Sequence, residues 1–346
     1  MSASYQAVLW NRQKKIYDRL IAMFALLYLV LFISLTSLIN PEVTQETLII
    51  RSTATLALLM LHVILMIGPL ARINTSFLPL LYNRRHLGVT MFVVAAVHGI
   101  FSTIQFHALG NINPVLSLFL SNKHYESLSK FPFEAFGFFA LIILFLMAIT
   151  SHDFWLHNLG PRTWKTLHMM VYVAYALIIL HVMLGVIQYE TSPALTALLG
   201  VGMIMIITFH IIAGYREHKR DIVGQSGNLE GFQKACALSA IPENRAKVVT
   251  FGGERIAIFK YDNKVSAISN VCKHQNGPLG EGKIVDGCVT CPWHGYQYLP
   301  HNGASPPPFT EKVATFDVKI VNGEVWINPV GYPEGTERKP AVINEQ

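Results

Sequence analysis

Charged residues are scarce in this sequence. Asp, Glu, Lys and Arg make up 14% of its 346 residues, and hydrophobic residues make up 52%, whereas soluble domains average about 25% charged residues. The scarcity is uneven, because residues 1–214 contain long uncharged runs and residues 215–346 have an ordinary mixture. The composition therefore excludes a single soluble domain and predicts a multidomain membrane protein.

A concentrated basic surface is also missing. The formal net charge is +6, but Lys and Arg lie at the ends of apolar segments rather than in a stripe. We therefore exclude nucleic acid as a partner and expect the lipid bilayer instead.

Six apolar segments approach or reach the roughly 20 residues that a bilayer-spanning helix needs. The first follows a basic start and no small-x-small cleavage pattern comes after it, so we interpret it as a retained span rather than a signal peptide. The sequence thus predicts an all-α six-helix transmembrane bundle within residues 1–214, with spans at about 20–39, 52–71, 87–107, 133–150, 167–187 and 194–214.

Lys and Arg are distributed unequally between the two ends of these spans. If the N-terminus is cytoplasmic, the outer segments contain three, which are Arg51, Lys123 and Lys130. Cytoplasmic loops are enriched in Lys and Arg, and an even number of spans returns the chain to its starting side. We therefore expect a multi-pass protein of the plasma or inner membrane with both termini in the cytoplasm. The inner segments contain twelve: Arg12, Lys14, Lys15, Arg19, Arg72, Arg84, Arg85, Arg162, Lys165, Arg216, Lys219 and Arg220.

Short β-rich runs follow a polar linker at residues 215–230. One of them contains Asn322-Gly323 between two alternating apolar runs, which is typical of a hairpin. We expect a small all-β domain over residues 231–329 and a loose tail over residues 330–346.

Cysteine is rare, with four in the chain, and two of them belong to mixed Cys/His half-sites. Zinc binds Cys2His2 sets, but zinc fingers place their histidines on a helix, whereas Pro and Gly, which favour turns, surround these half-sites. A two-iron cluster fits better if each loop gives its Cys to one iron and its His to the other. The candidate ligands are Cys272, His274, Cys291 and His294.

The loops "CKH" and "CPWHG", with "PLGEG" between them, resemble the Rieske family over residues 231–329. The resemblance implies a [2Fe–2S] cluster with the four ligands above. The chain lacks the extra cysteines that form a disulfide in the Rieske proteins of quinol–cytochrome c reductases, so the domain is similar to the ferredoxin and oxygenase kinds. Cys288 could form a redox pair with Cys291, but we interpret Cys288 and Cys236 as buried core residues.

Ionisable residues within a span are functional candidates by default, and four histidines in the predicted spans form a pattern. His86 and His98 lie twelve residues apart in the third span, and His168 and His181 lie thirteen apart in the fifth. These two spans run parallel, so each level offers one imidazole per helix: His86 with His168 inside and His98 with His181 outside. Each pair could clamp a b-type haem. The spacings do not fall on one face of a straight helix, so a tilt or kink is required.

Three other histidines of the spans do not fit this pattern. We expect each of them to bond a neighbouring helix or to face a crevice: His62, His107 and His210.

The runs "RRHLGVTMFVVAAVH" and "LGPRTWKTLHMMVYVAYALIILH" resemble the ferric-reductase-like transmembrane family over about residues 50–214. That family includes NADPH oxidases, yeast ferric reductases and the haem-bearing subunit of a bacterial periplasmic methionine sulfoxide reductase system. The resemblance implies one or two haem b groups with these four histidines as axial ligands. The bacterial subunit does not generally have a histidine at the position of His86, so the inner haem depends on geometry and on the oxidase analogy.

These features predict a transmembrane electron-transfer protein. A cytoplasmic donor, such as a flavin reductase, would reduce the cluster, and electrons would reach the haem and then an external or quinone acceptor. Whether the chain is itself an enzyme stays open. One alternative is a ferric or quinone reductase with its own outer-face site near His107 or His124. Another is a non-catalytic zinc-binding membrane sensor.

Overall fold

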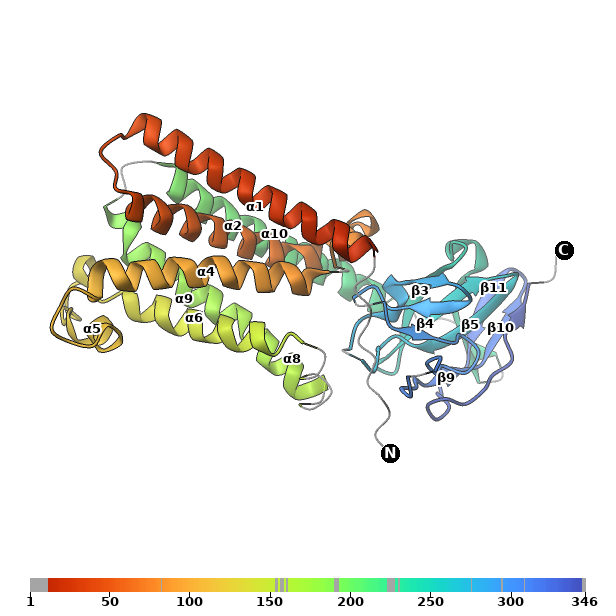
Figure 1. Ribbon diagram of the computed structural model, residues 1–346. Coiled ribbons are helices and arrows are strands. Elements are labelled where there is room, and N and C mark those ends of the chain that lie inside the picture. The colour runs from red at the N-terminus through yellow and green to blue at the C-terminus, as the bar shows by residue number, and fades with distance from the viewer. Residues whose placement is uncertain are drawn as a thin grey trace. The chain divides into compact units, whose positions relative to one another are not determined.

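The structure is a computed structural model (Figure 1). It describes residues 12–81, 83–152, 155, 159, 161–189, 193–222, 228–229, 231–274, 276–293, 295–307 and 309–343. The chain divides into two compact units. The helical unit comprises Asn11–Met66 and Arg84–Thr208. The second unit, called the β unit below, includes Ile67–Asn83 and Phe209–Gln346.

Five helical segments of the described chain are long and apolar enough to cross a membrane. The fourth predicted span, at residues 133–150, is the shorter helix α6, whose 16 residues rise about 24 Å, against about 30 Å for the hydrocarbon core. The predicted six-helix membrane region is thus confirmed with one short member. The helices are α1 Arg12–Ile39, α2 Gln45–Ile73, α3 Leu78–Leu81, α4 Arg84–His107, α5 Pro114–Leu120, α6 Glu134–Ile149, α8 Pro161–Met169, α9 Val171–Leu184 and α10 Pro193–Ile222.

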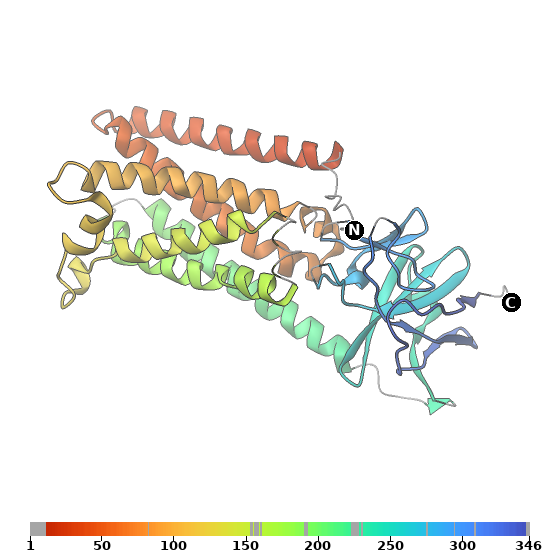
Figure 2. The same ribbon diagram turned by 60° about the horizontal axis from the view of Figure 1, so that its bottom comes forward.

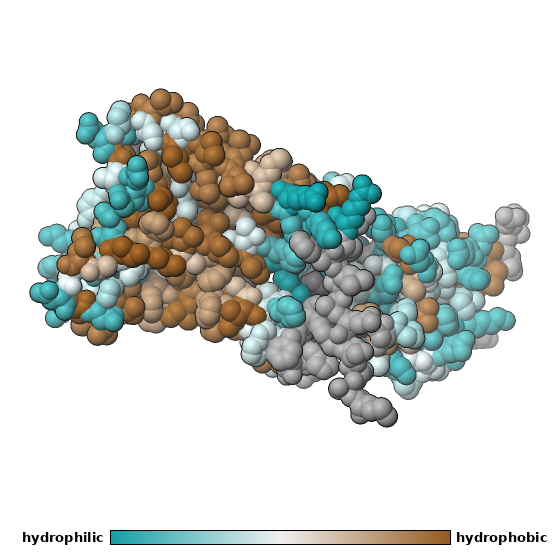
Figure 3. Space-filling model, in the orientation of Figure 1, coloured by the Kyte–Doolittle hydropathy of each residue, from teal (hydrophilic) through white to brown (hydrophobic). Residues whose placement is uncertain are grey.

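Apolar side chains cover the outside of these helices (Figure 3). In α1, Phe24, Leu26 and Val30 are all about three-fifths exposed, which would be costly in water and is expected of a surface that faces lipid. By contrast, half of the apolar window of α2 is buried inside the protein. Helices α4, α6 and α9 lie side by side in both ribbon views (Figure 2).

The fifth predicted span is interrupted at Met170, between α8 and α9. The Met170 N–H donates to the carbonyl of Leu167, three residues back, whereas the Ala174 N–H donates to Met170, four residues back. One tight turn of this kind changes the rotational phase of the helix. His168 and His181 lie on opposite sides of the break, so the irregularity that their spacing required is present.

The second unit contains three antiparallel sheets, in the strand orders β1-β2-β11-β10, β12-β5-β4-β3 with β9 beside β5, and β6-β7-β8. The predicted hairpin joins β10 to β11, where Asn322 and Gly323 both have positive φ, as a two-residue turn of this type requires. The strands are β1 Asn228–Leu229, β2 Phe232–Ala237, β3 Arg245–Phe251, β4 Glu254–Tyr261, β5 Lys264–Ser269, β6 Lys283–Val285, β7 Cys288–Thr290, β8 Gln297–Tyr298, β9 Thr315–Phe316, β10 Val318–Val321, β11 Glu324–Ile327 and β12 Ala341–Val342.

Strand β4 is buried on both faces. Ile256 and Ile258 belong to one apolar cluster, and the alternate residues Ala257 and Phe259 belong to a second. This explains the unbroken apolar run of the strand, because a strand covered on both sides need not alternate. The second cluster also contains Cys272 and Cys291, so the two cysteines of the candidate site lie in a packed core.

The prediction of a loose tail is wrong as far as residue 343. Strand β12 pairs with β5, with Ala341 opposite Val265. Farther back, the Arg338 guanidinium donates to the Asp317 carboxylate at 2.7 Å and lies over the Tyr332 ring. The sequence reading missed this because the partners of the tail are far away in the chain.

Candidate functional site

Two loops of the β unit have the same backbone hydrogen bonds. In the first, the Cys272 N–H donates to the carbonyl of Gly277 at 2.9 Å; in the second, the Cys291 N–H donates to the carbonyl of Tyr296 at 2.7 Å. In each loop the residue four places after the cysteine donates back to the cysteine carbonyl and has positive φ. The two half-sites are thus matching hairpin loops, closed by Asn276 and Gly295.

The cysteines of both loops are buried in the same apolar cluster. Cys272 is fully buried and Cys291 is 2% exposed. A Cβ added to Gly277 of the first loop would lie 2.8 Å from the Cys291 sulfur of the second. Glycine at this position therefore allows the loops to approach, and any larger residue would push them apart.

The Tyr298 hydroxyl forms a hydrogen bond with one of these sulfurs. It lies 3.4 Å from the Cys272 Sγ and accepts from the Lys273 N–H at 3.0 Å. A cysteine sulfur that ligates iron is a thiolate without a hydrogen, so in the loaded site the hydroxyl would donate to sulfur. Burial raises the pKa of Tyr298, and the neighbouring Cys272 raises that pKa further, so the proton stays on the hydroxyl.

This hydrogen bond should raise the reduction potential of an iron–sulfur cluster held by Cys272, because it stabilises the more negative, reduced state. Tyr298→Phe removes one hydrogen bond of about 1–1.5 kcal/mol. We expect the midpoint potential to fall by roughly 40–60 mV, since about 59 mV corresponds to 1.4 kcal/mol for one electron. An EPR-monitored redox titration measures the shift. Tyr261→Phe is the matched control, because this buried hydroxyl bonds Ser266 instead; an equal shift in both variants would contradict the assignment.

The imidazole ring of His274 is stacked on an aromatic ring. Its imidazole stacks on Tyr296, with ring centroids 4.8 Å apart and 11° between the planes. The Tyr296 hydroxyl donates to the Glu311 carboxylate. Burial, followed by this contact with Glu311, raises the pKa of Tyr296. The stack fixes the plane of the His274 ring. His294, the fourth predicted ligand, lies outside the described residues.

The other two cysteines are structural. Cys288 begins strand β7 and is 8% exposed, and Cys236 lies in β2. Burial raises the pKa of Cys288 and raises that of Cys236 to about 11, so both remain thiols. Cys288 forms no disulfide, in agreement with the interpretation of a buried strand residue. Within the described part of the chain, no three Cys, His, Asp or Glu side chains form a group that could hold a single metal ion.

In the helical unit, His98 of α4 and His181 of α9 face each other. Their ring centroids are 6.3 Å apart. Two imidazoles on opposite sides of one metal ion, each about 2 Å from it, place their centroids roughly 6–6.5 Å apart. The pair therefore fits the bis-histidine ligation of a haem iron.

Both imidazoles are also oriented for ligation. His98 Nδ1 lies 3.1 Å from the Ile50 carbonyl, and His181 Nδ1 lies 3.0 Å from the Phe133 carbonyl. A carbonyl accepts only from a protonated nitrogen, so Nδ1 carries the hydrogen and Nε2 keeps the lone pair that a metal needs. Gly137 of α6 makes room for one ring, since a Cβ there would lie 2.7 Å from His181 Nδ1.

The other predicted pair is not in ring contact. His86 Nδ1 lies 2.9 Å from the Asp18 carboxylate of α1. His168 Nδ1 lies 3.0 Å from the Trp164 carbonyl, and its buried Nε2 has no hydrogen-bond partner within the described chain. In both rings Nδ1 is therefore already engaged.

Two further histidines contact neighbouring helices, as expected. His62 of α2 bonds the Tyr175 hydroxyl of α9 at 3.0 Å, and His107 of α4 bonds Ser117 of α5 at 3.0 Å.

The sequence analysis missed the residues that support the candidate ligands, above all Tyr296 and Tyr298. Their alternation directly after "CPWHG" was the available signal, because residues two apart in a strand share a face.

Comparisons with known proteins divide the chain in the same way. The model of the Rieske [2Fe-2S] domain matches residues 231–317, and that of the ferric reductase like transmembrane component matches residues 51–179. The anthranilate 1,2-dioxygenase ferredoxin subunit of Burkholderia cepacia is 32% identical over 27% of this chain and 86% of its own length.

The membrane region has relatives of a different kind. The protein-methionine-sulfoxide reductase heme-binding subunit of Herminiimonas arsenicoxydans is 35% identical over 38% of this chain, and the match spans 56% of that protein.

Among solved structures, the ferredoxin of carbazole 1,9a-dioxygenase from Nocardioides aromaticivorans aligns with 29% of this chain and 98% of its own, at 22% identity and a TM-score of 0.27.

Proposed function

Since this chain belongs to the Rieske [2Fe–2S] proteins and has a membrane part similar to the ferric reductase like transmembrane components, we propose that it carries single electrons across the membrane. The electrons would pass between a cytoplasmic cluster and membrane-embedded b-type haem, and then to an acceptor on the outer side. The His98–His181 pair supports this most strongly, because it places two oriented imidazoles 6.3 Å apart within the helical unit.

The proposed cluster ligands are Cys272 and Cys291 on one iron and His274 and His294 on the other. The matching hairpin loops support this division, because each loop contributes one residue of each type. Neutral imidazoles on one iron raise the reduction potential relative to all-cysteine clusters.

The proposed haem ligands are His98 with His181 near the outer end of the bundle, and His86 with His168 near the inner end. A haem iron with two imidazole ligands accepts and returns one electron and has no open position for substrate. The contact of His86 with Asp18 supports the inner site, because a carboxylate on Nδ1 orients a histidine for ligation through Nε2.

The proposed orientation places the Rieske domain on the cytoplasmic side, where we propose that electrons enter. The excess of Lys and Arg in the inner segments, twelve against three, supports a cytoplasmic N-terminus and a cytoplasmic Rieske domain. The donor is then a cytoplasmic protein, such as a flavin reductase, and the acceptor is external or is a quinone of the bilayer.

Sidedness of reduction tests orientation and function together. Inverted membrane vesicles containing the full chain should show the reduced-cluster EPR signal as soon as a membrane-impermeant reductant is added. Right-side-out vesicles should show it only after permeabilisation. In the inverted vesicles, haem reduction should follow the cluster signal and should be absent from a Cys291→Ser variant. The reverse sidedness would overturn the orientation, and a reduced cluster beside permanently oxidised haem would overturn the function.

A further inference from the structure

A pocket of about 340 Å³ lies at the outer end of the helical unit. The connection between α5 and α6 forms one side, and the end of α9 with the residues after it forms the other. Phe131, Phe133 and Leu184 supply apolar walls. The volume is in the range of small-molecule sites, which combine such walls with a few polar groups.

The pocket lies next to the proposed outer haem ligand. Phe133 lines it, and the carbonyl of the same residue accepts the hydrogen bond from His181 Nδ1 at 3.0 Å. The Phe133 ring centroid is 5.3 Å from the imidazole centroid. Leu184, on the opposite wall, follows His181 by one helical turn. One residue thus separates the pocket from the His181 ring, which is close enough for electron transfer.

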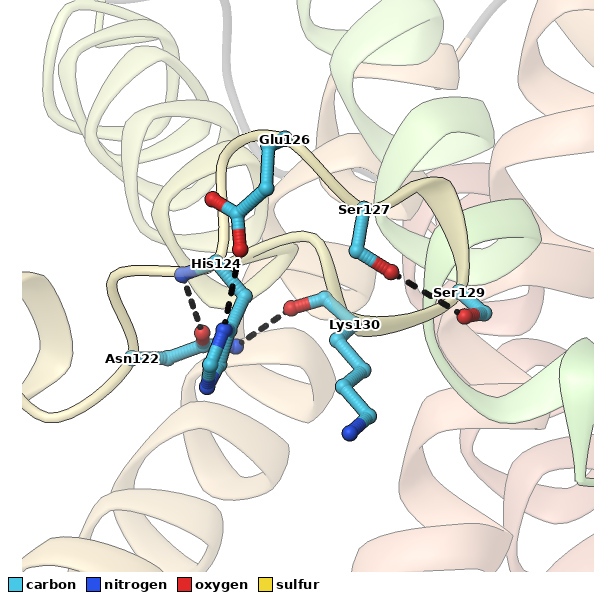
Figure 4. A network of polar contacts seen from close by, with 6 residues as sticks. All are labelled: Asn122, His124, Glu126, Ser127, Ser129 and Lys130. Carbon is cyan, nitrogen blue, oxygen red and sulfur yellow. Dashed lines mark hydrogen bonds and ion pairs between the residues drawn. The ribbon is translucent and has the colours of Figure 1, made fainter.

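The loop over the pocket is held in place by hydrogen bonds (Figure 4). The Asn122 side chain donates to the Lys130 carbonyl at 2.9 Å and accepts from the His124 N–H at 3.1 Å. From the other side, the Tyr189 hydroxyl donates to the Ser129 carbonyl at 3.2 Å. These bonds hold the loop that lines the pocket, and a wall that is already ordered lowers the entropy cost of binding.

The polar groups of the pocket favour an electron-rich oxygen ligand. None of the described lining residues is acidic, whereas Lys130 and His124 can both donate hydrogen bonds. Figure 4 shows the Lys130 side chain extended away from the other labelled residues, with its ammonium apart from their contacts. His124 itself pairs with the Glu126 carboxylate at 3.1 Å on the exposed side of the loop.

The surroundings indicate where the ligand comes from. Tyr125 and Leu128, in the connection between α5 and α6, are 61% and 76% exposed, and Leu109, between α4 and α5, is 94% exposed. Apolar and aromatic side chains in such a loop match the membrane–water interface. A ligand dissolved in the bilayer can therefore reach the pocket without crossing bulk water.

We propose that this pocket binds the head group of a membrane quinone as the electron acceptor. This inference rests on the proposed function, in which electrons reach the outer haem one at a time. The quinone takes up two electrons, supplied in two steps by the cluster's donor, and two protons from the outer aqueous side, and becomes the quinol. Lys130 donates to a ring oxygen as negative charge develops on it, and the aromatic walls pack against the ring faces.

Equilibrium binding to the oxidised protein tests the pocket independently of electron transfer. Purified full-length protein with its cofactors, in lipid nanodiscs, is titrated calorimetrically with a short-chain benzoquinone. Lys130→Met should weaken binding about tenfold or more, the loss expected for one charge-assisted hydrogen bond, and Lys130→Arg should largely retain it. Lys123→Met is the matched control, because it removes the same charge from the same loop outside the pocket lining.

The outcomes separate this proposal from the proposed function. Equal weakening in the Lys123 and Lys130 variants would overturn the pocket, as would binding of ferric citrate in place of the quinone. Absence of quinone binding, while the cluster still reduces the haem, would overturn the pocket and leave the proposed function intact. Normal quinone binding in a protein whose cluster cannot reduce its haem would instead overturn the proposed function.

Discussion

Replacing His181 with Ala should remove the haem at the outer end of the bundle. His181 and His98 offer the two imidazoles that fit one iron, and alanine leaves one of them without a counterpart. The haem-to-protein ratio, measured as the pyridine haemochrome, should fall by about one. It should fall from about two to about one if the inner site is also filled, and to near zero if it is not. The Rieske EPR signal should survive, since the cluster loops belong to the other unit.

His107→Ala is the matched control for this loss. His107 is a buried histidine at the end of α4, and it bonds Ser117 rather than a facing imidazole. Both substitutions empty a buried space and should lower the free energy of unfolding by about 2–4 kcal/mol. Only His181→Ala should lower haem content, so an equal loss in both would mean that instability, not ligation, removes the haem. The same assay on His86→Ala determines whether an inner haem exists.

The membrane region was predictable because its signals are local. The length of the apolar runs was enough to place the spans. In the β unit, the apolar run of β4 was visible in the same way, although its burial on both faces was not. The ligand candidates were also local, since Cys272 with His274 is a three-residue pattern. Chemistry that depends on residue type and short spacing can be read from one sequence without knowing the fold.

The groups that orient these ligands were not predictable. Ile50 and Phe133 each lie 48 residues from the histidine they bond, and they contribute a backbone carbonyl that any residue type could supply. Gly137 reveals its role only when α6 packs against α9. The sequence offered an outer-face site near His124 as one alternative, but it could not give the shape of the pocket, whose walls come from two segments that meet only in the folded bundle.

The connection before α6 shows how much structure a predicted spacer can contain. The predicted spans already left residues 108–132 between them, and in the structure this connection folds into α5 and a loop held by the Asn122 side chain. A sequence reading that counts spans treats such connections as spacers. Polar loops at the ends of membrane helices are nevertheless where ligands from either phase can enter.

Replacing Cys291 with Ser should abolish the iron–sulfur cluster, whereas Cys288→Ser should leave it intact. Cluster iron binds thiolate, and a serine hydroxyl at the 2%-exposed position of Cys291 is a poor substitute. Cys288 lies three residues earlier, but it begins strand β7, and burial raises its pKa so that it remains a thiol. Iron and acid-labile sulfide per chain, together with the EPR signal of the reduced protein, measure the outcome. Haem content should be unchanged in both variants. Loss of the cluster in both would make Cys288 a ligand or a structural requirement of the site, and zinc without sulfide in the parent protein would replace electron transfer with the sensor alternative.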